Sequence, residues 1–266
     1  MWKLAPLGCL LLASVHAEVA AVNGVKIYYE VHGQGQPVVL LHGGMHGIQS
    51  SFAQQFAPLA LGHKVIAIEQ MGHGHTPDVP GRALSYQAMA EDTAALLVKL
   101  GIANAVLIGW SDGGQIALRL AFTHPELVRR VVAAGVGLGA APAVVKELGV
   151  PKDFPKLAAN MFPQGFAEYH RISPDGPAHW AVIAQKGHQM WTKPSWGFDI
   201  ADLAKIKRPV LIVAGDRDFV SIEESARIYR AIPGAKLFIL PGTGHTTFQD
   251  RPNWFNPVLL DFLNQK

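Results

Sequence analysis

The sequence has little cysteine, few charges and no long apolar run. One cysteine in 266 residues excludes an internal disulfide framework. A net charge of +3, with no Lys/Arg run interleaved with aromatic residues, argues against a nucleic-acid partner. No apolar stretch is long enough for stable membrane insertion. With 49% hydrophobic residues, no internal repeat and no low-complexity segment, the chain is expected to bury one large core.

The first residues differ from the rest of the chain. A short positively charged start, a largely apolar stretch and small residues up to Ala17 are typical of a secretory signal peptide. We therefore predict a signal peptide at residues 1–17 and a secreted or periplasmic protein. The alternatives are a helix that packs on the domain, or a lipoprotein anchor on Cys9, which Pro6 disfavours because a lipobox has leucine there. Cleavage after Ala17 would leave no cysteine.

A β-type apolar run enters a Gly-x-Ser-x-Gly turn at residues 109–113, and a helix-forming run leaves it. A serine at the apex of so tight a turn takes strained backbone angles, which the small neighbours Gly109 and Gly113 tolerate. The Ser111 hydroxyl would then stand clear of the backbone at a helix N-terminus, where free N–H groups stabilise negative charge. This context predicts that Ser111 is a nucleophile. The alternative is a glycine-rich turn that happens to contain serine.

Two further β-type runs end in residues that would complete a catalytic triad. The run at residues 210–215 is followed by Asp216 and Asp218, and the run at residues 236–240 is followed by His245. Serine, acid and histidine in this order, each beyond the end of a strand, is the order of the α/β-hydrolase triad rather than that of chymotrypsin or subtilisin. Either aspartate could be the acid on this pattern alone.

The rest of the chain alternates strand and helix signals, which predicts an α/β architecture. Asn23-Gly24 between two β-prone runs predicts a hairpin. Ser221, followed three residues later by Glu224, predicts a helix start. Further predicted elements are strands at residues 38–41, 64–68 and 128–136, a helix near residues 52–61, and a helix that ends at Gly101.

Strand signals disappear between residues 138 and 207. Prolines there keep any helices short, and the many aromatic residues could simply form the insertion's own small core. A helical cap over strand ends, however, also needs an apolar face toward the active site. We predict a helical cap at residues 138–207 over a core made of residues 18–137 and 208–266. Part of its apolar side should line a substrate pocket that controls substrate size and water access.

The motifs at residues 42–44 (His-Gly-Gly), 72–76, 109–114, 215–218 and 242–245 are similar to those of the α/β-hydrolase superfamily. The resemblance implies the α/β-hydrolase fold, with a mostly parallel eight-stranded sheet, flanking helices and a small helical cap. It selects Asp218 as the triad acid and implies an oxyanion hole formed by the main-chain N–H groups of Gly44 and Asp112. It implies no cofactor. His46, His73 and His75 match no zinc spacing, so no metal is expected.

Two positions depart from the family pattern. The loop at residues 69–76 lacks the usual arginine, and Asp112 stands where methionine is common. The elbow resembles that of biphenyl-hydrolase-like esterases of the valacyclovir-hydrolase type, in which this acid receives a substrate ammonium group. One hypothesis is thus that Asp112 favours α-amino esters; the alternative is that it braces the elbow helix. The residues expected to bind substrate are Met45, Trp110, Asp112 and Trp191.

These features predict a serine carboxylesterase that cleaves small to medium-sized esters through an acyl-enzyme. Ser111 would be the nucleophile, His245 the base and Asp218 the acid. A C–C bond hydrolase or a cofactor-free perhydrolase would use the same triad, and a non-catalytic ligand-binding homologue would keep the fold. Serine rather than aspartate at position 111 disfavours haloalkane dehalogenases and epoxide hydrolases. The expected partner is a small-molecule ester; the oligomeric state stays open.

Overall fold

The structure, a computed structural model, describes residues 16–139, 149–150, 152–193, 197 and 199–265. The expected signal peptide therefore lies outside the described residues, except for His16 and Ala17. Eight strands form in the described part. They are β1 (His16–Val22), β2 (Val25–His32), β3 (Gln36–Leu41), β4 (His63–Ile68), β5 (Ala105–Trp110), β6 (Val128–Ala134), β7 (Val210–Gly215) and β8 (Lys236–Leu240).

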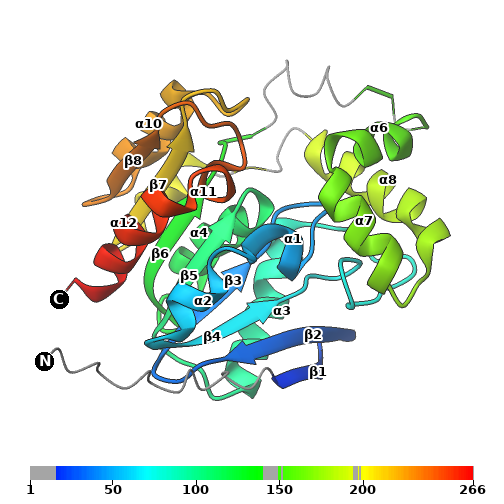
Figure 1. Ribbon diagram of the computed structural model, residues 1–266, viewed down its shortest axis with the longest axis horizontal. Helices are drawn as coiled ribbons and strands as arrows, with labels where there is room; N and C mark the ends of the chain where they lie inside the picture. Colours follow the sequence, from blue (N-terminus) through cyan, green and yellow to red (C-terminus); the bar gives the residue numbers. More distant parts are fainter. Residues whose placement is uncertain (1–15, 140–148, 151, 194–196, 198, 266) are drawn as a thin grey trace, which may run out of the picture.

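The strands form one sheet in the order β1-β2-β4-β3-β5-β6-β7-β8 (Figure 1). Strand β2 runs antiparallel to both β1 and β4, and the other neighbouring pairs are parallel. The hairpin between β1 and β2 turns at Asn23 and Gly24, whose φ angles of 47° and 80° suit a type I′ turn. The predicted fold class, a mostly parallel eight-stranded sheet flanked by helices, is confirmed.

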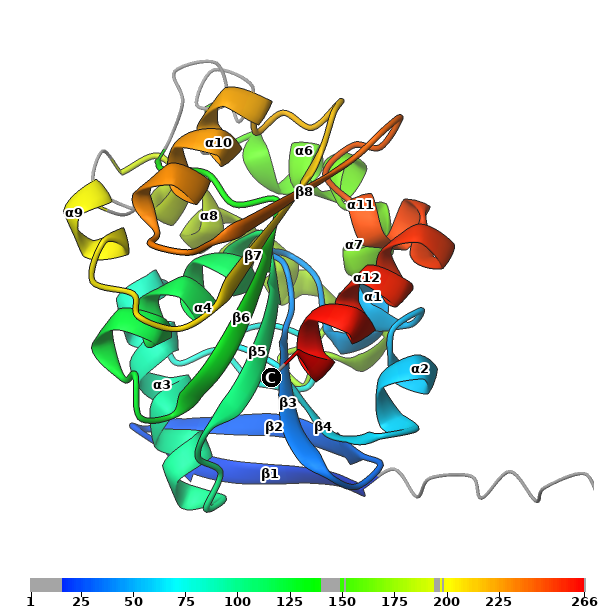
Figure 2. The same cartoon turned by 90° about the vertical axis from the view of Figure 1, so that its left-hand side faces the viewer.

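Helices cover both faces of the sheet (Figure 2), so every residue of the interior strands β5 and β7 is buried. Among the described residues, no helix is long and apolar enough to cross a membrane. One face carries α3 (Tyr86–Lys99), α4 (Asp112–Thr123), α9 (Ile200–Leu203) and α10 (Ile222–Ala231). The other carries α1 (Ile48–Phe52), α2 (Phe56–Ala60), α11 (Thr247–Asp250) and α12 (Pro252–Asn264).

The start of α10 and the end of α3 lie where the sequence predicts them. The Ser221 hydroxyl accepts the Glu224 N–H over 3.1 Å at the start of α10, and α3 is followed by Gly101 with a φ of 64°. The prediction of a single helix near residues 52–61 is wrong, because two short helices, α1 and α2, form in this region. The turn between them lets the buried side-chain amide of Gln55 donate to the oxygen of Asn256 in α12 over 3.1 Å.

The insertion forms α6 (Phe154–Met161), α7 (Pro163–Ile172), the 3-10 helix η1 (Pro177–His179) and α8 (Trp180–Trp191). These elements gather at one end of the sheet, and no strand occurs among the insertion's described residues (Figure 1). Residues 140–148, 151, 194–196 and 198 lie outside the described residues. Helix α9 falls within the predicted cap range, yet Leu203 is buried in the core, so α9 packs with the sheet domain rather than with the cap.

Two buried carboxylates attach the cap to the core. Glu168 on α7 accepts the main-chain N–H groups of Gly47, Gln49 and Ser50 at the start of α1, over 3.0 to 3.1 Å. The first N–H groups of a helix have no main-chain partner within it, so the carboxylate satisfies them; the Gly47 N–H also donates to the Ser50 hydroxyl. On the other side of the cap, Lys186 of α8 forms a 2.7 Å ion pair with Asp78, which follows β4.

The sheet order brings the important loops together. Strand β3 lies between β4 and β5, so the chain reverses its winding direction there, and ligands of open α/β sheets bind outside the carboxyl ends of strands at such a point. Leu41 at the end of β3 pairs with Gly109 near the end of β5. The loop that follows β3 therefore lies beside the turn that carries Ser111.

Candidate active site

Ser111 occupies the apex of a tight turn between β5 and α4, as the motif predicts. Its φ of 53° and ψ of −116° lie in a region that side-chain-bearing residues rarely adopt. A Cβ on Gly109 would lie 2.1 Å from the Gly113 oxygen, and a Cβ on Gly113 would lie 1.9 Å from the Leu41 oxygen. Both glycines are therefore required sterically, and the turn holds the Ser111 hydroxyl at the N-terminus of α4.

Ser111, His245 and Asp218 form one chain of hydrogen bonds. The Ser111 Oγ lies 2.8 Å from His245 Nε2, and His245 Nδ1 lies 2.9 Å from Asp218 Oδ1 and 3.0 Å from Oδ2. The Asp218 side chain is fully buried, and its Oδ1 also accepts the Val220 N–H. This geometry lets His245 accept a proton from Ser111 while its other nitrogen donates to a fixed carboxylate.

Asp216, the alternative acid, serves a different purpose in the structure. Its Oδ1 accepts the N–H groups of Gly242 and Thr243 over 2.6 and 3.2 Å. It therefore ties the loop after β7 to the loop after β8, and it does not contact His245. Of the two aspartates, only Asp218 is hydrogen-bonded to the histidine.

Three residues that the sequence analysis missed contact the proposed catalytic residues, two of them at His245 and one at Asp112. Gly135, with a φ of 61°, leaves room for the imidazole, because a Cβ there would lie 2.9 Å from His245 Cε1. Phe219 packs on the imidazole with ring centres 4.2 Å apart. The third residue, Tyr86 on α3, donates its hydroxyl hydrogen to Asp112. Phe219 directly follows the triad acid in sequence, which is the one signal that could have pointed to it.

The loop after β3 carries the expected oxyanion donor. The N–H of Met45 donates to His73 Nε2 over 3.2 Å, so that group is occupied. The hydrogen bonds of the described residues include none donated by the N–H of Gly44 or of Asp112. Gly44 also lies against the elbow, since a Cβ there would be 2.3 Å from Asp112 Oδ2. Neither N–H therefore has a protein acceptor among the described hydrogen bonds that would compete with a substrate oxygen.

Asp112 is a buried carboxylate beside this loop. Its Oδ1 accepts the Tyr86 hydroxyl over 2.5 Å and the Trp191 indole N–H over 3.0 Å. Burial raises the pKa of Asp112 to about 6, while the hydrogen bonds from Tyr86 and Trp191 oppose the rise. Because two protein donors already bind the carboxylate, the arrangement favours the bracing interpretation of Asp112 over recognition of a substrate ammonium group.

Of the other residues expected to bind substrate, Trp191 and Met45 lie where the cap meets the core, and Trp110 lies inside the core. Trp191 ends α8 of the cap and covers the oxyanion loop, since a Cβ on Gly44 would lie 2.5 Å from its ring. Met45 is buried against the cap with a φ of 60°. Trp110 differs from its expected role: it is only 2% exposed, packs edge-on against Phe248, and donates its indole N–H to the His245 main-chain oxygen.

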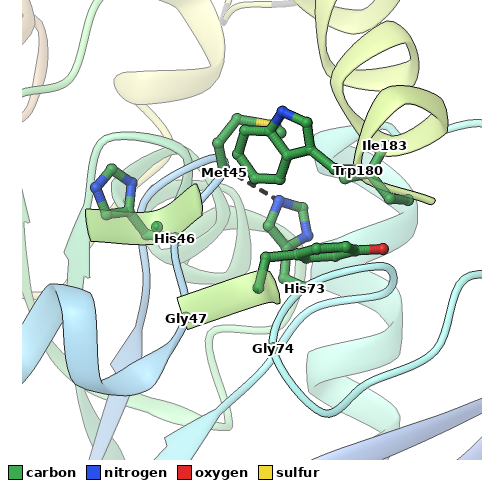
Figure 3. A pocket seen from close by; sticks show the side chains of 9 residues that line it. Met45, His46, Gly47, His73, Gly74, Trp180 and Ile183 are labelled. Atoms are coloured by element: carbon green, nitrogen blue, oxygen red, sulfur yellow. Dashed lines mark hydrogen bonds between the residues drawn. The ribbon is translucent and has the colours of Figure 1, made fainter. Parts of the chain in front are cut away.

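A second small hollow lies between the core loops and the cap (Figure 3). Met45, His46, His73, Trp180 and Ile183 contribute to its lining, and Ser111 does not. The space is too narrow to hold a water molecule, so it is a packed contact between core and cap rather than a substrate pocket.

The loop at residues 69–76 is held without the family arginine. The buried Glu69 carboxylate accepts both the main-chain N–H and the ring Nδ1–H of His75, over 2.5 and 3.0 Å. Burial raises the pKa of Glu69, and its hydrogen bond raises the pKa of His75. The Thr76 hydroxyl donates to the Glu69 main-chain oxygen over 2.8 Å. A carboxylate–imidazole pair thus braces this loop.

The described residues offer no cluster of three or more His, Cys, Asp or Glu side chains that could hold a metal. Two of the histidines considered for a metal site in the sequence analysis are hydrogen-bonded to main-chain oxygens. His46 Nδ1 donates to the Gly44 oxygen, and His73 Nδ1 donates to the Met71 oxygen.

A family model described as the alpha/beta hydrolase family matches residues 38–258. The chain therefore belongs to the alpha/beta hydrolase family and is a hydrolase. It is 30% identical over 263 residues to the "Putative non-heme chloroperoxidase" of Synechocystis sp., covering 90% of this chain and 95% of that protein. It is 26% identical over 272 residues to the sn-1-specific diacylglycerol lipase ABHD11 of Danio rerio, covering 90% and 83%. A bromoperoxidase structure from Bacillus anthracis matches with a TM-score of 0.78 and 28% identity, covering 94% of this chain and 100% of that one.

Proposed function

We propose that the protein is a serine carboxylesterase that hydrolyses small to medium-sized esters through an acyl-enzyme. The observation that carries the proposal is the unbroken chain of hydrogen bonds from Ser111 through His245 to Asp218. The N–H groups of Gly44 and Asp112 beside it supply the second requirement, a place for the developing oxyanion. The related diacylglycerol lipase, whose name describes ester cleavage, supports an ester substrate.

Acylation begins when His245 Nε2 takes the Ser111 proton as Oγ attacks the ester carbonyl carbon. Asp218 holds the imidazole in the tautomer that leaves Nε2 free to accept, and it stabilises the imidazolium that forms. The tetrahedral intermediate then collapses. Its bond to the alkoxy oxygen breaks, and His245 returns the proton to the leaving alcohol.

Deacylation repeats these steps with water as the nucleophile. His245 removes a proton from water as the water oxygen attacks the acyl carbon, and it then protonates Ser111 as the acid leaves. In both halves the carbonyl oxygen becomes negative, and the Gly44 and Asp112 N–H groups bind it. Losing one such donor typically costs about 3 to 4 kcal/mol of transition-state stabilisation.

The cap sets the size of the substrate in this proposal. Trp191 lies over Gly44 and is tied to Asp112 by its indole N–H, so it forms a fixed wall next to the reacting carbonyl. A bulky aromatic ring in this position favours a compact acyl group. Met45, on the same loop as Gly44, packs in one hydrophobic cluster with the cap residues and with Trp191, and so supports the position of Trp191.

A cofactor-free perhydrolase is the second candidate, with C–C bond hydrolysis a further variant on the same triad. The names of the chloroperoxidase and bromoperoxidase relatives favour the perhydrolase. Here hydrogen peroxide would replace water in attacking the acyl-enzyme, and the product would be a peracid. The two reactions share acylation of Ser111 and differ only in the second nucleophile.

Hydrolysis of p-nitrophenyl esters from acetate to long-chain acyl groups, with and without a serine-directed phosphonate, tests the proposal. We expect turnover that the phosphonate abolishes, with an optimum at short to medium acyl chains. Adding hydrogen peroxide and measuring peracid separates the two candidates. No turnover of any ester, with Ser111 still labelled stoichiometrically, would contradict the esterase and direct the search to C–C bond cleavage.

We also propose export through a signal peptide at residues 1–17. Cleavage after Ala17 would leave Glu18 at the start of β1, where its carboxylate accepts the Tyr29 hydroxyl over 2.7 Å. The shortened strand would keep its pairing from Glu18 to Val22. The mass of the protein recovered from the medium or periplasm tests this, and an uncleaved chain retained in the cytoplasm would contradict it.

A further inference from the structure

Histidines hold both peptide groups that flank Gly44. In the first, the Gly43 carbonyl accepts His42 Nδ1 over 2.8 Å and the His46 N–H over 3.2 Å. In the second, the Gly44 carbonyl accepts His46 Nδ1 over 2.9 Å, and the Met45 N–H donates to His73 Nε2 over 3.2 Å. The peptide between Gly44 and Met45 is therefore held at its oxygen by one histidine and at its nitrogen by another. The bond to His73 is drawn as a dashed line in Figure 3.

Gly44 needs this external support because it must be glycine. Any Cβ there would collide with Asp112 and Trp191, at 2.3 and 2.5 Å. Glycine, however, populates left-handed and right-handed backbone regions about equally, so its own conformation does not fix the direction of its N–H. Met45 next to it holds a φ of 60°, which is costly for a residue with a side chain and persists only where surrounding contacts impose it.

We infer that His46 and His73 are positioning residues for the oxyanion hole. They clamp the peptide between Gly44 and Met45, while the main-chain N–H of His46 and the ring of His42 hold the oxygen of the preceding peptide, which carries the Gly44 N–H. Because both peptides that flank Gly44 are fixed, its N–H keeps its direction toward the substrate oxygen. The inference rests on the proposed function, since it assigns a task to that same hole. His42 links the peptide that carries the Gly44 N–H to the loop after β4, where its Nε2 accepts the Gln70 N–H over 2.9 Å.

The clamp requires both rings to be neutral and in one tautomer. The Met71 carbonyl can only accept, so His73 Nδ1 carries the hydrogen and Nε2 is free to accept the Met45 N–H. In the same way His46 carries its hydrogen on Nδ1, facing the Gly44 carbonyl. Both rings are buried, and burial lowers the pKa of each to about 4, which keeps them neutral near pH 7.

The two amide replacements of His73 separate positioning from a purely structural role. In His73→Gln the amide oxygen takes the place of Nε2 and can still accept the Met45 N–H, whereas the bond to Met71 is lost. In His73→Asn the amide nitrogen takes the place of Nδ1 and can still donate to Met71, whereas the acceptor for Met45 is lost. Each variant loses one buried hydrogen bond of the ring, so stability alone would not distinguish them.

We expect kcat for p-nitrophenyl acetate to fall about 10- to 100-fold in His73→Asn, with KM unchanged, and to stay within about threefold of wild type in His73→Gln. For His46 the order reverses, because its donor is Nδ1: His46→Asn should keep most of kcat and His46→Gln should lose it. The control is His63→Gln. His63 is a buried histidine at the start of β4, the end away from the loop that carries His73, and its Nδ1 donates to the Leu59 oxygen. Equal losses in the two amide variants at either position, or no loss at all, would overturn the inference.

A measurement without substrate tests the same clamp. In a protein labelled with 15N-histidine, we expect Nε2 of His73 to have the chemical shift of an unprotonated, hydrogen-bonded nitrogen and Nδ1 that of a protonated one. The reverse tautomer would overturn the clamp. Wild-type turnover in the kinetic assay separately tests the proposed function, because an inactive wild type with the expected tautomer would contradict the esterase and leave the clamp intact.

Discussion

The indole N–H of Trp110 donates to the main-chain oxygen of His245 over 2.8 Å. The residue directly before the proposed nucleophile therefore also holds the loop that carries the proposed base. The two residues are 135 positions apart in the chain, and the bond fixes how the end of β5 faces the loop after β8. The distance between Ser111 and His245 thus depends on a side chain that is buried in the core.

Replacing Trp110 by Phe should weaken catalysis more than folding. The variant keeps an aromatic ring against Phe248 but removes the N–H, so the free energy of unfolding should fall by about 1 to 2 kcal/mol. We expect a lower kcat with little change in KM, because the Ser111–His245 geometry loosens while the substrate wall is untouched. The control is Trp254→Phe, at a half-exposed tryptophan on α12. An unchanged kcat in Trp110→Phe would contradict this role.

The raised pKa of Asp112 predicts how stability depends on pH. Because burial raises the pKa from 3.8 to about 6, the folded protein binds a proton more tightly there than the unfolded chain does. The resulting stabilisation is complete below about pH 4 and is lost as pH rises through 6. Asp112→Asn removes this loss, so urea titrations should show its stability relative to wild type improving from pH 4 to pH 8, by at most about 3 kcal/mol. A difference that stays constant across this range would contradict the prediction.

The bracing interpretation of Asp112 makes a kinetic prediction as well. If Tyr86 and Trp191 are the true partners of the carboxylate, Asp112→Asn should leave the ratio of rates for an α-amino ester and its des-amino analogue unchanged. The measurement is kcat/KM for both esters in the wild type and the variant. A ratio that drops sharply in the variant would instead restore the hypothesis that Asp112 receives a substrate ammonium group.

Glu168 should contribute to the free energy of unfolding although it is not part of the triad. Glu168→Ala leaves the main-chain N–H groups of Gln49 and Ser50 without an acceptor, and the Gly47 N–H with only the Ser50 hydroxyl, so unfolding in denaturant should show a loss of about 3 kcal/mol. Glu126→Ala, at an exposed glutamate, is the matched control and should change stability little. A Glu168→Ala protein as stable as the control would show that the cap does not depend on this carboxylate.

The fold follows from local signals because each signal has a direct physical cause. A wholly apolar run such as β5 is stable only in a strand covered on both faces, and Asn23-Gly24 supplies the positive φ angles of a tight hairpin. The turn at Ser111 likewise needs its flanking glycines. These rules involve only residues that are close together in the chain, so the corresponding structures can be predicted from short stretches of sequence.

Other features depend on partners far away in the chain and leave no local pattern. The side of the sheet on which Trp110 packs depends on His245 and Phe248, and the break between α1 and α2 serves contacts of Gln55 with α11 and α12. The acceptor for the Met45 N–H is 28 residues further along, in a loop whose family arginine is missing. The triad could be predicted because its order is regular, but its supporting contacts could not.

Whether Ser111 is the nucleophile is tested by the mass of the protein after reaction with a fluorophosphonate. We expect one phosphonyl group to be added and peptide mapping to place it on Ser111. Ser111→Ala, while still folded, should take up none and lose nearly all ester turnover. Labelling at another residue, or ester turnover retained in the folded Ser111→Ala protein, would contradict the assignment of Ser111 as the nucleophile.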